Sequence, residues 1–166
     1  MAQRAESVLE NAARRARAAE PRGTRSARKT RRARANTRLA HAQAMLRLKR
    51  AGLRRTSSGR CANRWIRTCT SLENVREGSV RKVIRLKRRS GCPVTITGGT
   101  EVGHAPGRRS HGSGHKLDVA LNPCLDRYIT REFRPAGIRS DGAQLYQAPN
   151  GDVYARESDH WDILFR

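Results

Sequence analysis

The stretch around which this chain is organised reads SHGSGHKLD and spans residues 110–118. It sets a histidine, His111, seven positions before an aspartate, Asp118, with Gly112 and Gly114 between them. Glycine adopts backbone angles that other residues resist, so a tight turn here can bring the imidazole and the carboxylate together. We therefore expect a histidine in a loop and an aspartate in the following strand to face one common point.

A second stretch near the C-terminus, ESDHW at residues 157–161, places Glu157 three positions before His160. A turn there puts both side chains on the same side of the chain. Two imidazoles and one carboxylate, with a fourth position left to water, form a catalytic rather than a structural zinc site. A free carboxylate nearby can then take a proton from the activated water. The two stretches together predict one zinc ion held by His111, Asp118 and His160, with Glu157 as the catalytic carboxylate.

Positive charge is concentrated in the first half of the chain, which has 166 residues and a formal net charge of +22. Residues 1–60 contain 18 Lys and Arg against 3 acidic residues, and residues 61–90 contain 9 against 2. Residues 91–166 contain 9 of each sign and are neutral. The basic excess therefore belongs to the front of the chain and says nothing about the chemistry of the two motifs.

The front of the chain favours a basic arm rather than a folded domain. Residues 1–32 are rich in Arg and Ala and cannot bury enough apolar surface to offset their chain entropy, so disorder or a marginal helix is expected. Residues 37–51 show helical spacing, with Asn36 as a candidate N-cap, and residues 56–59 are typical of a linker. We therefore divide the chain into an arm at 1–60, disordered or partly helical, and a domain at 61–166.

The composition after residue 60 is typical of a small α+β domain. Apolar residues at helical spacing, β-branched runs and turn residues predict two helices and five strands. The helices are expected at 75–88 and from Pro123, with Asn122 as N-cap, to a break at 135–137; the strands are expected at 94–97, 117–121, 144–147, 153–156 and 161–165. These elements favour a small antiparallel sheet with packed helices.

Targeting signals and cysteines say little about the cellular compartment of the protein. No run of 18 apolar residues is present, which excludes a membrane-spanning helix, and the N-terminus lacks the apolar core of a secretory signal. The four cysteines allow two disulfides in three pairings, or none. Their spacings fit no zinc-finger pattern, which favours buried or occasionally paired thiols. These cysteines are Cys61, Cys69, Cys92 and Cys124.

The paired motifs His111-x-x-Gly114-x-x-x-Asp118 and Glu157-x-x-His160-Trp161 resemble those of a group of zinc peptidases. The group includes D-Ala-D-Ala carboxypeptidases and dipeptidases, phage L-alanyl-D-glutamate endolysins and the zinc domain of hedgehog proteins. The segments 97–104 (TGGTEVGH) and 159–162 (DHWD) look most like a phage-associated branch. The resemblance covers residues 61–166. It implies the zinc ligands named above, Glu157 as general base and acid, and peptidoglycan stem peptides as substrate.

The sequence departs from the pattern of this group in three places. Relatives commonly have a small residue where this chain has Lys116, and many have a second histidine where it has Asp162. Their upstream strand commonly ends in a motif with an arginine that stabilises the tetrahedral oxyanion, but residues 98–101 read GGTE. Arg108 or Arg109, just before the ligand loop, is the candidate substitute. Losing such a group lowers the rate by orders of magnitude and leaves metal binding intact.

Further side chains are candidates for contacts around the ion or with the substrate. His104 and His115 suit such contacts as well as they suit solvated loop positions. Asp159 and Asp162 are loop carboxylates in the simplest interpretation, and either can instead orient a ligand imidazole. Trp161 can form a wall of the site and lower its dielectric constant.

The leading hypothesis is a phage-derived, zinc-dependent peptidoglycan peptidase, either a carboxypeptidase or an endopeptidase, that acts in lysis or in entering a host cell. Such a protein is expected in the host cytoplasm before release to the periplasm or cell wall, or on the virion. The basic arm suits anionic envelope polymers, nucleic acid, or no partner at all. The alternative is a non-catalytic, zinc-stabilised protein that binds virion components or nucleic acid through the arm. Glu157 speaks against it, because a purely structural ion does not require that carboxylate.

Overall fold

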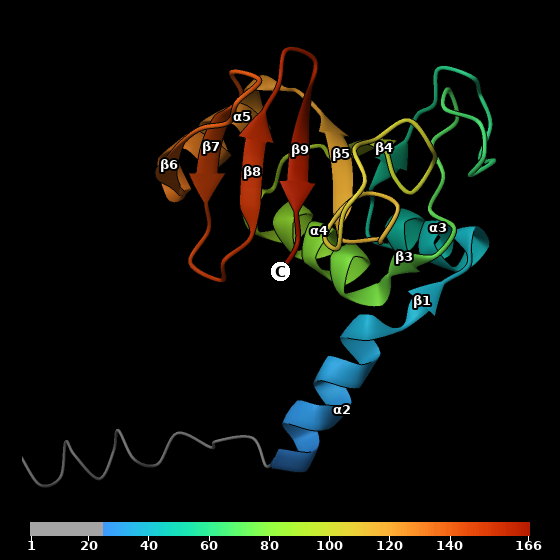
Figure 1. Cartoon of the computed structure of the whole chain (residues 1–166). Helices are drawn as coiled ribbons and strands as arrows, with labels where there is room; N and C mark the ends of the chain where they lie inside the picture. Colours follow the sequence, from blue (N-terminus) through green and yellow to red (C-terminus); the bar gives the residue numbers. More distant parts are fainter. Residues whose placement is uncertain (1–24) are drawn as a thin grey trace, which may run out of the picture. The chain divides into compact units, whose positions relative to one another are not determined.

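The computed structural model describes residues 25–166, and the chain divides into two units, Met1–Ala33 and Arg34–Arg166. The predictions for residues 1–24 lie outside the described part. The helices in that part are α2 (Arg25–Asn36), α3 (His41–Arg50), α4 (Glu77–Ser90) and α5 (Pro123–Glu132) (Figure 1). The strands there are β1 (Arg38–Leu39), β2 (Arg54–Arg55), β3 (Val75–Arg76), β4 (Thr95–Gly98), β5 (Lys116–Ala120), β6 (Arg134–Ile138), β7 (Gln144–Gln147), β8 (Val153–Arg156) and β9 (His160–Leu164). The predicted α+β class is confirmed.

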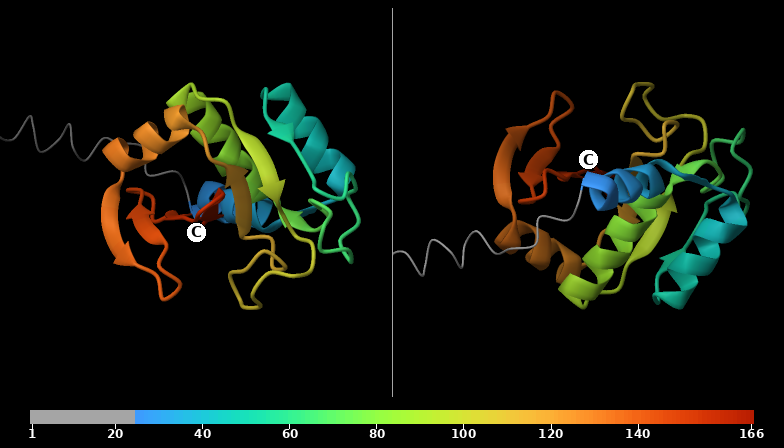
Figure 2. Two further views of the ribbon diagram at one scale, coloured as in Figure 1. Left: turned by 90° about the horizontal axis from the view of Figure 1, so that it is seen from above. Right: turned by 90° about the horizontal axis from the view of Figure 1, so that it is seen from below.

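Seven strands form one sheet in the order β2-β4-β5-β9-β8-β7-β6, and β1 pairs with β3 in a separate two-stranded sheet. Helices α3, α4 and α5 lie along one face of the seven-stranded sheet, and the loop from β4 to β5 lies on the other side (Figure 2). Strand β5 pairs with β4 on one edge and with β9 on the other. The loop and these central strands therefore meet on the side away from the helices.

The large sheet is mixed, whereas the sequence predicted an antiparallel one. Strand β2 runs parallel to β4, with Arg54 opposite Thr95. The backbone N–H of Arg54 donates to the carbonyl of Val94 at 3.0 Å, and the N–H of Thr56 donates to that of Ile96 at 2.9 Å. Residues 54–55 carry no strand signal of their own, because their two arginines precede a linker-like segment. Their strand exists because β4 offers an open edge.

The folded unit begins closer to the N-terminus than the boundary predicted at residue 61. Its core includes Leu39, Ala44, Leu48 and Leu53, all of which are buried together with apolar residues of α4, β4 and β5. Many charged residues surround these four positions, so the composition of the segment did not indicate that it contributes to the core. Residues 34–60 therefore belong to the compact unit, and the arm is shorter than predicted.

The second helix of the described region, α3, starts at His41 and not near residue 37. Arg38 and Leu39 are instead extended and pair with Arg76 and Val75 of β3. The N–H of Ala40 donates to Gln43 Oε1 at 3.2 Å, which satisfies one backbone group at the helix start. The predicted N-cap residue, Asn36, is the last residue of α2.

The helices that pack on the sheet follow their sequence signals closely. Asn122 caps α5 as predicted, because its Oδ1 accepts the N–H of Leu125 at 2.9 Å, and Pro123 opens the helix. The chain then continues directly into β6, where the sequence predicted only a break around residues 135–137.

Among residues 25–166, no helix combines the length and the apolar composition that crossing a membrane requires.

All four cysteines are paired, which corrects the expectation of mainly reduced thiols. Cys61 bonds to Cys69 within one loop, and Cys92, just before β4, bonds to Cys124 in α5. Spacing alone could not select this pairing, since three pairings fit four cysteines. The second disulfide joins two segments that pack on the same core.

Removing the Cys92–Cys124 disulfide is expected to destabilise the fold substantially. The bond closes a loop with a sequence separation of 32 residues. The chain-entropy estimate for such a loop is about 3–4 kcal/mol at 25 °C. We expect the double substitution Cys92→Ser, Cys124→Ser to lower the free energy of unfolding by roughly that amount in urea titrations. The matched double change at Cys61 and Cys69, which close a loop of separation 8, should cost less. Equal losses would contradict the loop-length argument.

Candidate metal centre

Strands β5 and β9 bring three functional side chains to one place on the sheet. Their antiparallel register sets Asp118 opposite Asp162 and Ala120 opposite His160. Directly opposite residues share a face of the sheet, and so do residues two apart on one strand. The side chains of Asp118, His160 and Asp162 therefore face the same side. Asp118 and Asp162 are buried there, and His160 is partly exposed.

Trp161 faces the core, so its predicted place as a wall of the metal site is wrong. Its side chain is fully buried, and its Nε1 donates to Asp126 Oδ1 at 2.8 Å. Its ring meets that of Tyr146 edge to face at 5.8 Å. The alternation of side chains along β9 turns Trp161 away from its neighbours His160 and Asp162.

The loop before β5 fixes His111 through backbone contacts. Gly114 has a φ of +72°, and its N–H donates to the carbonyl of His111 at 2.7 Å, which closes the expected tight turn. A Cβ on Gly114 would lie 2.8 Å from the carbonyl oxygen of Asn74, so no other residue fits there. His111 Nδ1 lies 2.8 Å from the carbonyl of Gly99. A carbonyl only accepts, so Nδ1 is the donor and Nε2 is turned toward the site.

The two histidines of the motifs both point a ring nitrogen at one carboxylate oxygen, Asp118 Oδ1. His111 Nε2 lies 3.2 Å from it and His160 Nε2 lies 3.4 Å from it. Two ligand atoms that bind one tetrahedral ion at 2.0–2.1 Å are themselves about 3.3 Å apart. Each histidine nitrogen is therefore at a distance from Asp118 Oδ1 that two ligands of one ion have. Among residues 25–166, the group whose ligand atoms all lie within 4.8 Å of one another is His104, His111 and Asp118, and it does not include His160.

Two buried carboxylate oxygens at this point have no hydrogen-bond partner within residues 25–166. They are Asp118 Oδ1 and Asp162 Oδ1, and the second lies 3.5 Å from His111 Nε2. A buried acceptor without a donor is costly, and a cation that it coordinates removes the cost. The residues present thus fit a metal ion, because the atoms that lack partners are the atoms that would bind it.

His104 joins the site and is a ligand candidate that the motifs did not single out. Its ring stacks on that of His111 with centroids 3.8 Å apart, and its Nδ1 lies 3.9 Å from Asp118 Oδ2. His104, His111 and Asp118 each offer one ligand atom, and these atoms lie within 4.8 Å of one another, so the group can hold a metal ion. The sequence offered His104 only as a contact around the ion or with the substrate.

Glu101 is a structural anchor of the site that sequence reasoning missed. Its buried carboxylate accepts the N–H groups of Gly99, at 2.9 and 3.1 Å, and of Ser71, at 2.7 Å, and it lies 3.1 Å from His104 Nε2. Burial raises the pKa of Glu101, but the bonds from His104 and the backbone outweigh it and lower the pKa. Glu101 thus holds the segment whose Gly99 carbonyl orients His111. An acidic residue inside a glycine-rich loop is the signal that could have found it.

Glu157 lies beside the ligands and is held by an arginine from another hairpin. Its Oε2 is 3.5 Å from His160 Nε2, and its Oε1 accepts a hydrogen bond from Arg139 Nη2. Arg139 Nη1 also donates to Asp162 Oδ2 at 2.8 Å, and the same guanidinium bonds Asp141. Arg139 lies in the turn between β6 and β7. No sequence pattern placed Arg139 at this site, because β6 itself was not predicted.

The carboxylates perturb the protonation of the site. Burial lowers the pKa of His111, but the adjacent Asp118 and Asp162 outweigh it and raise that pKa to about 9. Burial raises the pKa of Asp162, yet His111 and Lys116 hold it well below its usual range. A proton on His111 Nε2 thus occupies the position of a metal ion, so metal binding must release it.

Of the remaining candidate residues, one contacts a predicted ligand and the others have different surroundings. Asp159 contacts a predicted ligand, with its Oδ1 2.7 Å from His160 Nδ1, as expected for a carboxylate that orients an imidazole. His115 instead bonds Ser113 Oγ at 2.9 Å, and burial together with nearby arginines lowers its pKa to about 4. Arg108 and Arg109 are exposed in the loop between β4 and β5. The arginine that bonds Glu157 is Arg139, which was not among these candidates.

These contacts define a class of site: a largely buried centre of histidines and carboxylates that fits one metal ion, with an acidic side chain beside it. No protein-family model, curated protein or solved structure matches the chain. The geometry of this centre and its two motifs are therefore the features that bear on the function of the protein.

Proposed function

We propose that this protein is a zinc-dependent peptidase that hydrolyses an amide bond in the stem peptides of peptidoglycan. The observation that carries the proposal is that His111 Nε2 and His160 Nε2 both lie close to Asp118 Oδ1. Glu157 lies next to His160. The resemblance of the motifs to zinc D-Ala-D-Ala carboxypeptidases and phage endolysins supports the substrate class. The fold is assigned to the same group on that ground.

His111, Asp118 and His160 would hold the ion, and Asp159 would keep the imidazole of His160 in its ligating orientation. When bound, zinc polarises the carbonyl of the scissile amide and lowers the pKa of the attacking water. Glu157 Oε2 faces the ligands and takes the proton of that water. The same oxygen then delivers the proton to the leaving amine.

Arg139 is assigned a positioning role toward Glu157. Its two nitrogens bond Glu157 and Asp162, so it fixes the base relative to the ligand strand β9. Three carboxylates around it raise its pKa further, Asp141 most strongly, so it stays charged throughout the reaction.

Substituting Arg139 should impair hydrolysis and leave metal binding intact. Arg139→Met removes both bonds and lets the Glu157 carboxylate move, and misplacing a catalytic group by about 1 Å can cost roughly 100-fold in rate. We expect such a loss in kcat, with unchanged zinc content by atomic absorption. Asp141→Asn is the matched control, because Asp141 contacts the same guanidinium but is half exposed. A loss of zinc in Arg139→Met, or an equal loss of rate in the control, would contradict the positioning role.

The proposal extends to where the protein acts and to its basic arm. A peptidase of this kind would be phage-derived and would reach the cell wall from the host cytoplasm or from the virion. The basic residues at the front of the chain would bring it to anionic envelope polymers, because clustered Arg gives salt-sensitive attraction to polyanions.

Defined muropeptides test the proposal directly. The zinc-loaded protein should cleave a soluble stem peptide, and the masses of the fragments identify the bond that is cut. Treatment with a chelator should abolish the activity, and added zinc should restore it. Failure of the zinc-loaded protein to cleave D-Ala-D-Ala, L-Ala-D-Glu or cross-bridge substrates would refute the assignment.

A further inference from the structure

The loop closed by the Cys61–Cys69 disulfide presents a large aromatic side chain to solvent. The side chain of Trp65 is 76 % exposed, and Ile66 beside it is 46 % exposed. Exposed apolar side chains that lie together on a soluble protein often mark a binding site. The loop between the two cysteines also carries Arg64 and Arg67 and no acidic residue.

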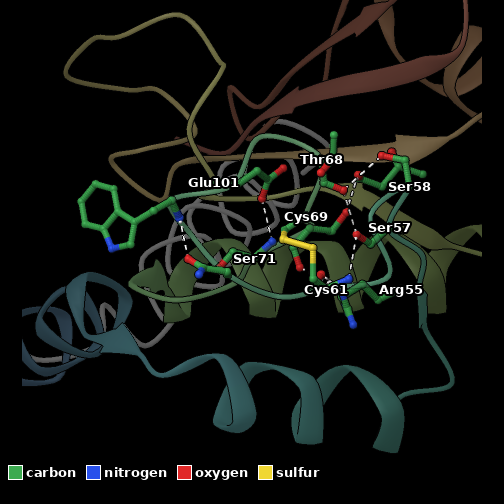
Figure 3. Close-up of a disulfide and its surroundings, with 12 residues drawn as sticks. Arg55, Ser57, Ser58, Cys61, Thr68, Cys69, Ser71 and Glu101 are labelled. Carbon is green, nitrogen blue, oxygen red and sulfur yellow. Dashed lines mark hydrogen bonds between the residues drawn. A yellow bond between two sulfur atoms is a disulfide. The ribbon is translucent and has the colours of Figure 1, made fainter.

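The loop is held rigidly on the folded unit. Around the disulfide, Arg55 donates to the carbonyls of Cys61 and Thr70, both at 2.9 Å, and the hydroxyls of Ser57 and Ser58 donate to the carbonyl of Thr68 (Figure 3). Glu101, which supports the metal centre, accepts the N–H of Ser71 just beyond the loop. A rigid, exposed aromatic loses little conformational entropy when it binds a ligand, and this favours a binding role.

The loop borders the metal centre through two contacts. Arg64 Nη2 donates to the carbonyl of Gly112 at 2.8 Å, next to the ligand His111. The N–H of Val102 donates to the carbonyl of Arg64 at 2.9 Å, in the segment between Glu101 and His104. Val102 is itself 40 % exposed, so it adds apolar surface at the same border. Trp65 thus belongs to the rim of the site on the side of His104.

We infer that this rim, formed by Trp65, Ile66, Val102 and the two arginines, binds the glycan strand that carries the stem peptide. The inference rests on the proposed function, which supplies the sugar. The apolar C–H face of a pyranose ring stacks on an indole, much as the face of a base stacks on an aromatic side chain. The guanidinium of Arg64, whose carbon is 5.9 Å from the indole centre, holds the loop through its bond to Gly112. Arg67, in the same loop, complements the carboxylates of the stem peptide.

The glycan site makes the enzyme prefer polymeric substrate over free peptide. A peptide on a bound strand reaches the metal centre at a high effective concentration, and a free peptide does not. An aromatic anchor of this kind is worth about tenfold or more in affinity. Trp65 therefore contributes to substrate capture, and the bond-breaking step is independent of it.

Binding to purified sacculi, measured with hydrolysis switched off, tests the inference. In the full chain carrying Glu157→Gln, adding Trp65→Ala should weaken binding to insoluble peptidoglycan about tenfold or more, and Trp65→Phe should retain most of it. Leu46→Ala is the matched control, because Leu46 is 51 % exposed on α3 and should not affect binding. Soluble glycan chains without peptide should compete with the sacculi.

The outcomes separate this inference from the proposed function. Equal binding with and without Trp65, or no competition by peptide-free glycan, would overturn the glycan site whether or not the protein is a peptidase. With an active enzyme, Trp65→Ala should slow the digestion of sacculi about tenfold and leave the cleavage of a free stem peptide unchanged. An equal loss on both substrates would show that Trp65 supports the metal centre and would also overturn the inference.

Discussion

Replacing Glu157 by Gln should reduce the hydrolysis of stem peptides by about a thousandfold while leaving the zinc in place. The amide keeps the shape of the side chain and its bond from Arg139 but cannot take up a proton. General acid–base groups contribute roughly 10²–10⁴-fold to such rates, and Glu157 would serve both steps of the reaction. Because Glu157 is outside the proposed ligand set, the zinc content should stay at one ion per chain.

Metal content and single-turnover rates should be measured together on the purified variant. Glu132→Gln is the matched control, since Glu132 is an exposed carboxylate at the end of α5 that pairs with Arg131 on the same helix. The control should behave as the original protein in both measurements. Full activity in Glu157→Gln would end the proposed mechanism, and loss of zinc would make Glu157 a ligand instead of a base.

Replacing Asp118 by Asn should weaken zinc binding by more than about 100-fold. Changes to groups that merely support a ligand cost 10–100-fold in metal affinity, so the loss of a charged ligand should exceed that range. Without metal, the variant also loses the buried pair of Asp118 Oδ1 and His111 Nε2, 3.2 Å apart, so some loss of stability is expected. Zinc should raise the melting temperature of the original protein and have little effect on the variant.

A buried aspartate elsewhere provides the comparison that makes this test specific. Asp152, which lies outside both motifs, accepts a bond from Lys82 at 2.7 Å and from the N–H of Arg166 at 2.8 Å. Asp152→Asn should lower stability by breaking a buried ion pair and should keep its affinity for zinc. Unchanged zinc affinity in Asp118→Asn, measured by competition with a chelator, would remove Asp118 from the ligand set.

Much of the site could be predicted from the sequence because its residues lie in two short stretches. His111 and Asp118 are joined by a turn that Gly114 makes possible, and Glu157 and His160 are three residues apart. Local spacing of this kind survives any uncertainty about the rest of the fold. The convergence of both stretches depends on the pairing of β5 with β9, which the sequence allowed but did not specify.

The parts that sequence reasoning missed depend on contacts between distant segments. Arg139 reaches Glu157 only because residues 134–138 form a strand, whereas their proline and glycine indicated the end of a helix. Trp161 was placed at the site for its position in a motif, although the alternation of β9 sends it to the core. Leu39 and Leu48 are buried because they pack with α4 and β3. The local sequence does not reveal this burial, because both leucines lie among basic residues.

The candidate ligands are divided between two strands and a loop, and this division affects how the proposed enzyme could be altered. Asp118, His160 and Asp162 are fixed by the hydrogen-bonded register of two central strands, and a slip by one residue would turn all three to the opposite face. His104 and His111 belong to a loop that only a few backbone contacts hold. The positions of Asp118, His160 and Asp162 are thus set by the sheet itself. A transplanted loop from a different hydrolase could therefore bring a new specificity without rebuilding the strands.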